Sequence, residues 1–228
     1  MIRPRNRVLP VPGLQALWLA LENVAGGASW LDRSGNGYHA ALTAPFAVTG
    51  GEGLTCSVGA GMAVIGNVLN FERTDSFSFV IGTTCMSFSA TGRFLLSKMR
   101  NGSGYAGTSF WIGNFGVLGC DLRNLYPTNQ LEVTRNAVLT AGTRYVLGWA
   151  YNGSSLASGA LLYVDGDTAA QTTNYNSLSA SILTTIPLQL GGLDGMGYQY
   201  VGQIHWAGIW NRVITPAEMS RINRVFNL

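Results

Sequence analysis

Short apolar segments with a period of two run along this chain and limit most strongly what it can fold into. Phe77 and Phe79 alternate with serines, and Leu147, Trp149 and Tyr151 alternate with small residues. Each set of large side chains therefore faces one side of a strand. Thirty glycines, with many Ser, Thr and Asn, separate such segments and are typical of tight turns between strands. This pattern predicts two packed antiparallel sheets.

The expected strands cover most of the chain. They are residues 14–21, 38–43, 62–66, 76–84, 93–99, 108–112, 117–122, 130–134, 144–151, 160–164, 188–191 and 203–211. The sequence predicts one helix near the C-terminal end, because Thr215 is a good N-cap, Pro216 suits the first helical position and Glu218 can complete a capping box. An apolar stripe at helical spacing follows, formed by Met219, Ile222, Val225 and Phe226.

Composition places the chain among folded, core-rich proteins. Apolar residues make up 47% of its 228 residues and charged residues 11%, the opposite of what disorder requires. We find no internal repeat or linker, so residues 14–228 are expected to form a single domain. Residues 1–13 hold three prolines and three arginines (Arg3, Arg5 and Arg7). They are expected to form an extended arm that docks on a partner.

Charge and hydropathy exclude several classes of partner. The net charge of +3 comes from thirteen arginines and one lysine, and no basic stripe alternates with aromatic residues, so nucleic-acid binding is not expected. No apolar run reaches the roughly 18 residues of a membrane span. The apolar segment after the basic start resembles a signal peptide, but Pro10 and Pro12 interrupt it. Cleavage, and export by that route, are therefore not expected.

The three cysteines, Cys56, Cys85 and Cys120, are far apart and odd in number. They lack the close spacing of a thiolate metal site. Buried free thiols are the expectation, which indicates folding in a reducing compartment.

Four segments in order resemble the laminin G-like, or concanavalin A-like lectin/glucanase, superfamily. They are residues 14–19 with the loop LDRSGNGYHAAL at 31–42, the strand DSFSF at 75–79, the pair GTRYVLGWAYNG and LYVDG at 142–153 and 162–166, and GQIHWAGIWNR with TPAE at 202–212 and 215–218. The resemblance implies an all-β, two-sheet antiparallel jelly-roll sandwich with one short C-terminal helix.

Members of this superfamily often bind calcium through an aspartate in the final strand, where this chain has His205. A neutral imidazole is a poor ligand for a hard cation. Asp32 remains as a weak candidate ligand, so calcium is disfavoured and no other cofactor is expected.

The residues of an enzyme site are hard to find. Glucanase relatives carry Glu, Asp and Glu at alternate positions of one strand, whereas the five glutamates here are widely separated. There is no G-x-S-x-G nucleophile motif, no phosphate loop and no dinucleotide motif. The sequence therefore predicts a protein that is not an enzyme.

An aromatic contact patch is predicted in the last strand. If Ala207 and Ile209 face the core, Trp206 points outward, and Tyr198 and Tyr200 on the preceding loop extend the patch. An exposed Trp can stack on a sugar or anchor a protein interface.

Two functions remain open. The first is a non-catalytic structural or adhesive component of a virus particle, such as a bacteriophage head-decoration or tail protein. It would assemble in the host cytoplasm and dock on other virion proteins as an oligomer or lattice, with the arm as one contact. The alternative is a lectin-like module that recognises a surface glycan. Fold alone does not choose between them.

Overall fold

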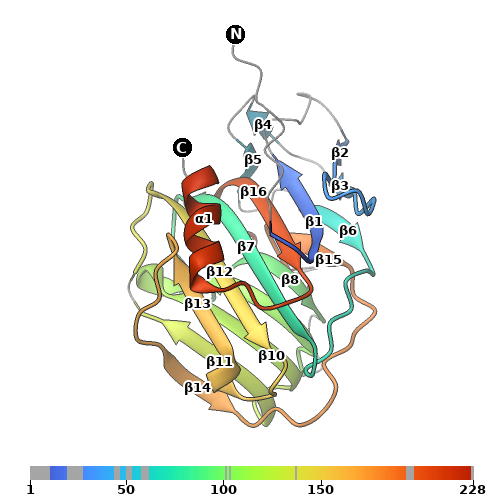
Figure 1. Ribbon diagram of the computed structural model, residues 1–228, viewed down its shortest axis with the longest axis vertical. Coiled ribbons are helices and arrows are strands. Elements are labelled where there is room, and N and C mark those ends of the chain that lie inside the picture. The colour runs from blue at the N-terminus through green and yellow to red at the C-terminus, as the bar shows by residue number, and fades with distance from the viewer. Residues whose placement is uncertain are drawn as a thin grey trace.

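Alternation of apolar and polar residues produces two sheets that pack face to face, as Figure 1 shows. The computed structural model describes residues 11–19, 28–43, 47–49, 53–57, 62–100, 102, 104–136, 138–193 and 198–226. Within these ranges every pairing between named strands is antiparallel, and a single α-helix, α1 (Pro216–Phe226), is present near the C-terminal end. The predicted jelly-roll sandwich with one C-terminal helix is confirmed.

One layer, which we call sheet A, has seven described strands. Its order is β13 (Ala160–Val164), β12 (Arg144–Asn152), β7 (Ser76–Cys85), β16 (Gly202–Trp210), β5 (Gly53–Cys56) and β4 (Ala47–Thr49), while β1 (Leu14–Leu19) also pairs with β16.

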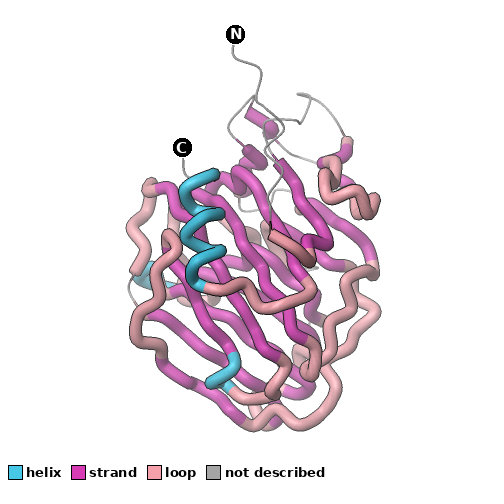
Figure 2. The backbone as a smooth tube through the Cα atoms, in the orientation of Figure 1, coloured by secondary structure: helices cyan, strands magenta, loops and turns pink. Residues whose placement is uncertain are grey.

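The other layer, sheet B, has nine described strands. Its order is β14 (Thr172–Asn176), β11 (Asn129–Arg135), β10 (Leu118–Leu125), β9 (Gly107–Ile112), β8 (Arg93–Met99), β15 (Leu188–Leu190), β6 (Ala63–Gly66), β3 (Ala40–Leu42) and β2 (Ser29–Trp30). In the described part of the chain, the 3₁₀ turns η2 (Asn114–Gly116) and η3 (Ala157–Gly159) lie between strands (Figure 2).

All twelve expected strands are present, with bounds that differ by a few residues, while residues 20 and 21 of the first expected strand lie outside the described residues. Four short strands were missed: β2, β4, β5 and β14. The strand β14 is mostly exposed and polar and pairs with β11 only, so its sequence carries little of the apolar alternation that identifies a strand.

The core between the sheets is aromatic. The ring of Phe77 stacks on Phe79 with centroids 4.8 Å apart, and Trp149 meets both of them edge-on. All three cysteines are buried and free, as predicted from their spacing. Burial raises the pKa of the Cys56 thiol to about 12.

Helix α1 lies over the outer face of sheet A (Figure 1), and a second apolar cluster fills the space between them. Met219 and Ile222 of the helix are buried in it, as the helical spacing predicted. Within the described part of the chain, no helix is long and apolar enough to cross a lipid bilayer.

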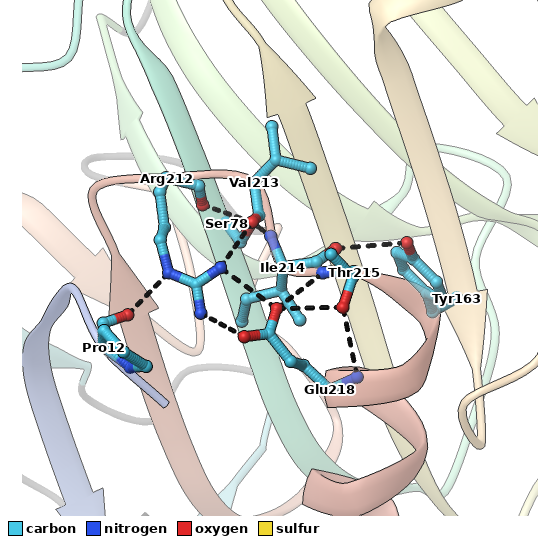
Figure 3. A network of polar contacts seen from close by, with 8 residues as sticks. All are labelled: Pro12, Ser78, Tyr163, Arg212, Val213, Ile214, Thr215 and Glu218. Carbon is cyan, nitrogen blue, oxygen red and sulfur yellow. Dashed lines mark hydrogen bonds and ion pairs between the residues drawn. The ribbon is translucent and has the colours of Figure 1, made fainter. Parts of the chain in front are cut away.

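Polar contacts fix the start of α1 (Figure 3). Thr215 Oγ1 accepts a hydrogen bond from the Glu218 N–H, and Glu218 Oε2 accepts one from the Thr215 N–H, which is the predicted capping box. The Arg212 guanidinium forms an ion pair with Glu218 and donates from Nε to the Pro12 carbonyl at 2.7 Å. The helix start is thereby connected to the segment that precedes β1.

Residues 1–10 of the expected arm, including Arg3, Arg5 and Arg7, lie outside the described residues. Of the remainder, Val11 is buried in the cluster beneath α1. Docking of the arm on a partner stays a prediction.

Candidate functional site

The residues expected to form an exposed aromatic patch do not meet. Trp206 points away from the main core, as the alternation in β16 predicted, but it is only 2% exposed because α1 covers it. Its exposure was wrongly predicted, since nothing in β16 itself indicates that the helix folds back over this face. Tyr200 is fully buried and its hydroxyl lies 2.7 Å from Thr83 Oγ1. Tyr198 alone remains partly exposed, and it lies against Phe94 with centroids 6.0 Å apart.

Asp32 organises its own loop. Its carboxylate accepts hydrogen bonds from the N–H groups of Leu17, Ser34 and Tyr38 and from the Ser34 hydroxyl. Each of these groups donates a hydrogen bond to the carboxylate, whereas calcium requires several oxygen ligands. The residues around Asp32 therefore do not fit a calcium site. His205 lies on β16, and its Nε2 is 2.9 Å from Thr84 Oγ1. Within the ranges the structure describes, no group of three or more metal-ligating side chains occurs.

A groove lies on the outer face of sheet B, away from α1. Along β10, Leu118, Cys120 and Leu122 belong to the core. The intervening Asp121 and Arg123 therefore face the other way and line the groove. Its volume is about 720 Å³, within the usual range of ligand sites. Strands β8, β9, β10, β11 and β14 contribute side chains, and the 3₁₀ turn η2 contributes Phe115.

Trp111 of β9 provides a flat wall of this groove. A β-carbon at Gly119 of the neighbouring strand would lie 2.3 to 2.5 Å from three atoms of the indole, Cζ2, Cε2 and Cη2. Three ring atoms at nearly equal distances mean that the indole covers Gly119 with its face. Only glycine leaves room for this arrangement. The opposite face of the partly exposed ring is directed to the groove.

A polar network fixes the orientation of the indole. Trp111 Nε1 donates to Asp121 Oδ2 at 2.8 Å, and the Ser109 hydroxyl donates to the same oxygen at 2.9 Å. Arg123 Nη2 donates to Asp121 Oδ2 and to Glu132 Oε2, each at 3.1 Å. Its Nε lies 3.1 Å from Asp121 Oδ1, an ion pair without hydrogen-bond geometry.

Asp121 is 1% exposed, and burial is the main reason why the pKa of its carboxyl rises from 3.8 to about 6. The nearby Arg123 acts in the opposite direction and favours the charged form, while Glu132, its register partner on β11, raises the pKa further. The carboxylate is therefore ionised at neutral pH and titrates in mildly acidic solution.

Tyrosines enclose the other end of the network. The Arg123 guanidinium lies over the Tyr126 ring, 5.1 Å from its centroid. The Tyr126 ring meets Tyr105 and Tyr175 edge-on, at 6.2 and 6.3 Å. Aromatic rings thus lie on both sides of the charged centre, Trp111 on one and the three tyrosines on the other.

Two aromatic residues of the groove have a backbone conformation that costs energy. Tyr105 has φ 54° and Phe115 has φ 55°, in the left-handed region that bulky side chains rarely adopt. Phe115 is also 77% exposed, which is unusual for so large an apolar side chain. Strain of this kind gathers at sites where function fixes the position of a side chain.

Sequence reasoning missed Trp111, Asp121, Arg123 and Glu132. The available signal was the pair of charged residues at alternate positions of an otherwise apolar strand, with Gly119 two residues before them. Identifying the site also required the register that places Asp121 opposite Glu132 and Gly119 opposite Trp111.

The fold defines a class of protein: a concanavalin A-like jelly roll with side chains gathered in a groove on one sheet. No known protein family matches the sequence, and no curated protein matches it.

Solved structures of this class are similar to the chain over most of its length. A sialidase of Trypanosoma rangeli in complex with sialic acid is 16% identical with a TM-score of 0.67, and the match covers 96% of this chain and 34% of the sialidase. The chain therefore spans about a third of the length of that enzyme.

Two binding modules are similar as well. The CBM40 carbohydrate-binding module of a Ruminococcus gnavus sialidase, bound to α2,3-sialyllactose, is 19% identical with a TM-score of 0.53, covering 66% of this chain and 83% of the module. The binding domain of Paraclostridial Mosquitocidal Protein 1 is 12% identical with a TM-score of 0.65, covering 94% and 52%. At such identities the likeness shows the fold alone.

Proposed function

We propose that this protein is a carbohydrate-binding module that holds a glycan in the groove of sheet B. The observation that carries the proposal is the indole of Trp111, which lies flat over Gly119 and presents its other face to the groove. A sugar ring has apolar C–H faces and polar hydroxyl edges. A fixed aromatic face with polar groups beside it complements both.

Polar groups for the hydroxyl edges stand next to the indole. Asn174 donates to Glu132 Oε1 at 2.9 Å and, more weakly, to Thr134 Oγ1 at 3.3 Å. These side chains line the groove together with Asn114 and Asn136. Amides and hydroxyls can donate and accept, as sugar hydroxyls do, so they can pair with a sugar in several orientations.

Two of the similar structures support the proposal. The CBM40 module carries sialyllactose in its structure, and the mosquitocidal protein fragment is a binding domain. For this chain, glycan binding remains our proposal.

The groove supports binding better than hydrolysis. A glycosidase of the usual kind needs two carboxyl groups about 5 to 10 Å apart that both reach the scissile bond. Asp121 is 1% exposed and its Oδ2 accepts three hydrogen bonds, so it cannot contact a ligand. Glu132 is then the one accessible carboxylate among the described residues that line the groove.

The location in a virion and the docking of residues 1–13 on other virion proteins stay predictions from the sequence. A glycan-binding surface is compatible with an adhesive role on a particle. The proposed glycan binding does not depend on such a role.

The proposal is tested on a glycan microarray followed by calorimetric titration of the best ligand. Trp111→Ala is expected to weaken binding at least about tenfold, equal to about 1.4 kcal/mol. Trp111→Phe keeps a smaller aromatic ring, and its affinity should fall between those of Trp111→Ala and the wild type. Met86→Ala is the control, because Met86 is 58% exposed and does not line the groove. Equal binding by Trp111→Ala and the wild type would contradict the proposal.

A further inference from the structure

We infer that the groove selects uncharged glycans and discriminates against carboxylated ones. This inference rests on the proposed function and specifies its ligand class. It follows from the charges that line the groove and from the partners these charges already have.

Carboxylates outnumber cations in the groove. Among its described lining residues, Asp121 and Glu132 carry negative charge, and Arg123 is the one that carries positive charge. At neutral pH these three side chains therefore have a net charge of −1. A carboxylated sugar that enters this partly desolvated space is repelled, because Coulomb interactions are stronger there than in bulk water.

Arg123 is already engaged by the protein. Its Nη2 donates to both Asp121 and Glu132, its Nε lies 3.1 Å from Asp121, and its guanidinium covers the Tyr126 ring. Arginine is the side chain best suited to hold a ligand carboxylate, through two parallel hydrogen bonds. A carboxylated glycan would have to compete with two carboxylates of the chain for this one guanidinium.

The arginines of the neighbouring strands do not supply a second cation. On β8, Arg93 Nη1 donates to the Gln199 carbonyl at 3.2 Å. On β11, Arg135 Nη1 donates to the Asp167 carbonyl at 2.8 Å, and its Nη2 lies 3.6 Å from the Asp167 carboxylate. Neither side chain lines the groove.

The inference separates this chain from the ligands in the similar structures. The sialidase holds sialic acid and the CBM40 module holds α2,3-sialyllactose, both of which are carboxylated. A shared fold therefore does not predict a shared ligand here.

The test compares matched sugars. The full-length protein is titrated with neutral hexasaccharides of glucose, mannose and galactose, and with the same hexasaccharides oxidised to carboxylates at C6. At pH 7.5 and low salt, the wild type is expected to bind at least one neutral hexasaccharide about tenfold or more tightly than its carboxylated form, because the net charge of the groove opposes the carboxylate.

Glu132→Gln removes one negative charge from the groove, and the ratio of the two affinities is expected to fall severalfold. Asp167→Asn is the matched control, since Asp167 loses the same charge outside the groove and should leave the ratio unchanged. Equal or tighter binding of the carboxylated form by the wild type would overturn the inference. So would an unchanged ratio in Glu132→Gln. Binding of neither series would overturn the proposed function, and the inference with it.

Discussion

The rings of Trp206 in β16 and Phe226 in α1 face each other with centroids 4.4 Å apart and planes inclined by 32°. The indole also fills the space above Gly82 of β7, where a β-carbon would lie 2.0 Å from its Nε1. Trp206 thus connects the helix to the centre of sheet A, and its role is structural.

Trp206→Ala is expected to destabilise the protein by about 3 to 5 kcal/mol, because it opens a large cavity between α1 and sheet A. Urea denaturation followed by circular dichroism measures the change. Exposed Leu183→Ala serves as control and should stay within about 0.5 kcal/mol of the wild type. A loss below about 1 kcal/mol for Trp206→Ala would mean that the helix does not depend on this contact.

Gly119→Ala is expected to weaken glycan binding while the protein remains folded. A β-carbon at Gly119 would lie 2.3 Å from the Trp111 ring, so the indole must tilt away from the sheet. Tryptophan fluorescence and calorimetric titration together follow the ring and the affinity. When Gly119→Ala is added to Trp111→Ala, the affinity should change little further, because both substitutions act on the same indole ring. Additive losses of affinity in the double variant would show that Gly119 does not act through the Trp111 ring.

Glu218 is expected to contribute to stability only above strongly acidic pH. Hydrogen bonds from Arg212, followed by those from Thr215, lower the pKa of Glu218 from 4.5 to about 2. A lowered folded-state pKa gives stability that is present above pH 4.5 and is lost as the pH falls toward 2. We expect about 1 kcal/mol, since both side chains are partly exposed to solvent.

Unfolding of the wild type and of Glu218→Gln across this pH range tests that expectation. The two stabilities should differ by a constant amount near neutral pH and converge toward pH 2. A difference that does not depend on pH would show that the ionised carboxylate is not what stabilises the helix start.

Asp121 should make glycan selection depend on pH. Its raised pKa of about 6 means that the carboxyl is charged at pH 7.5 and mostly neutral at pH 5. The charged groups in contact with it or opposite it are Arg123 and Glu132, and the net charge of the groove then changes from one negative charge to none. The preference for neutral over carboxylated hexasaccharides is expected to narrow at pH 5, measured by calorimetric titration. A preference that stays constant between the two pH values would contradict this prediction.

The Asp121 carboxyl changes the stability of the fold with pH in the opposite direction to Glu218. Because its folded-state pKa is raised, the native state binds the proton more strongly than the unfolded chain, and stability falls as the pH rises from about 3.8 to about 6. Part of the folding free energy is therefore given up to keep an ionised group hydrogen-bonded to the indole N–H.

Local sequence patterns predicted most of the fold. The alternation around Phe77 and Trp149 located β7 and β12, two of the three longest strands, and Thr215 with Glu218 located the start of α1. Edge strands such as β14 were missed, because an exposed strand with one neighbour needs few apolar residues.

The site was less accessible to sequence reasoning. The direction of Trp206 followed from alternation, but its burial depends on a helix that begins six residues after β16 ends. Trp111 and Gly119 are eight residues apart in the chain, and only the register of β9 against β10 shows that one covers the other. Contacts between neighbouring strands, not local pattern, define the groove.

Alternate residues of strand β10 have two different roles. Leu118, Cys120 and Leu122 hold the sandwich together, while Asp121 and Arg123 line the groove and Gly119 lies under the Trp111 ring. Arg123 and its groove-facing neighbours on β11 do not pack into the core, so a library randomised at these positions would sample new sugar preferences on an unchanged interior. Such a strand can acquire a different ligand in small evolutionary steps, because each step leaves the packing of the two sheets in place.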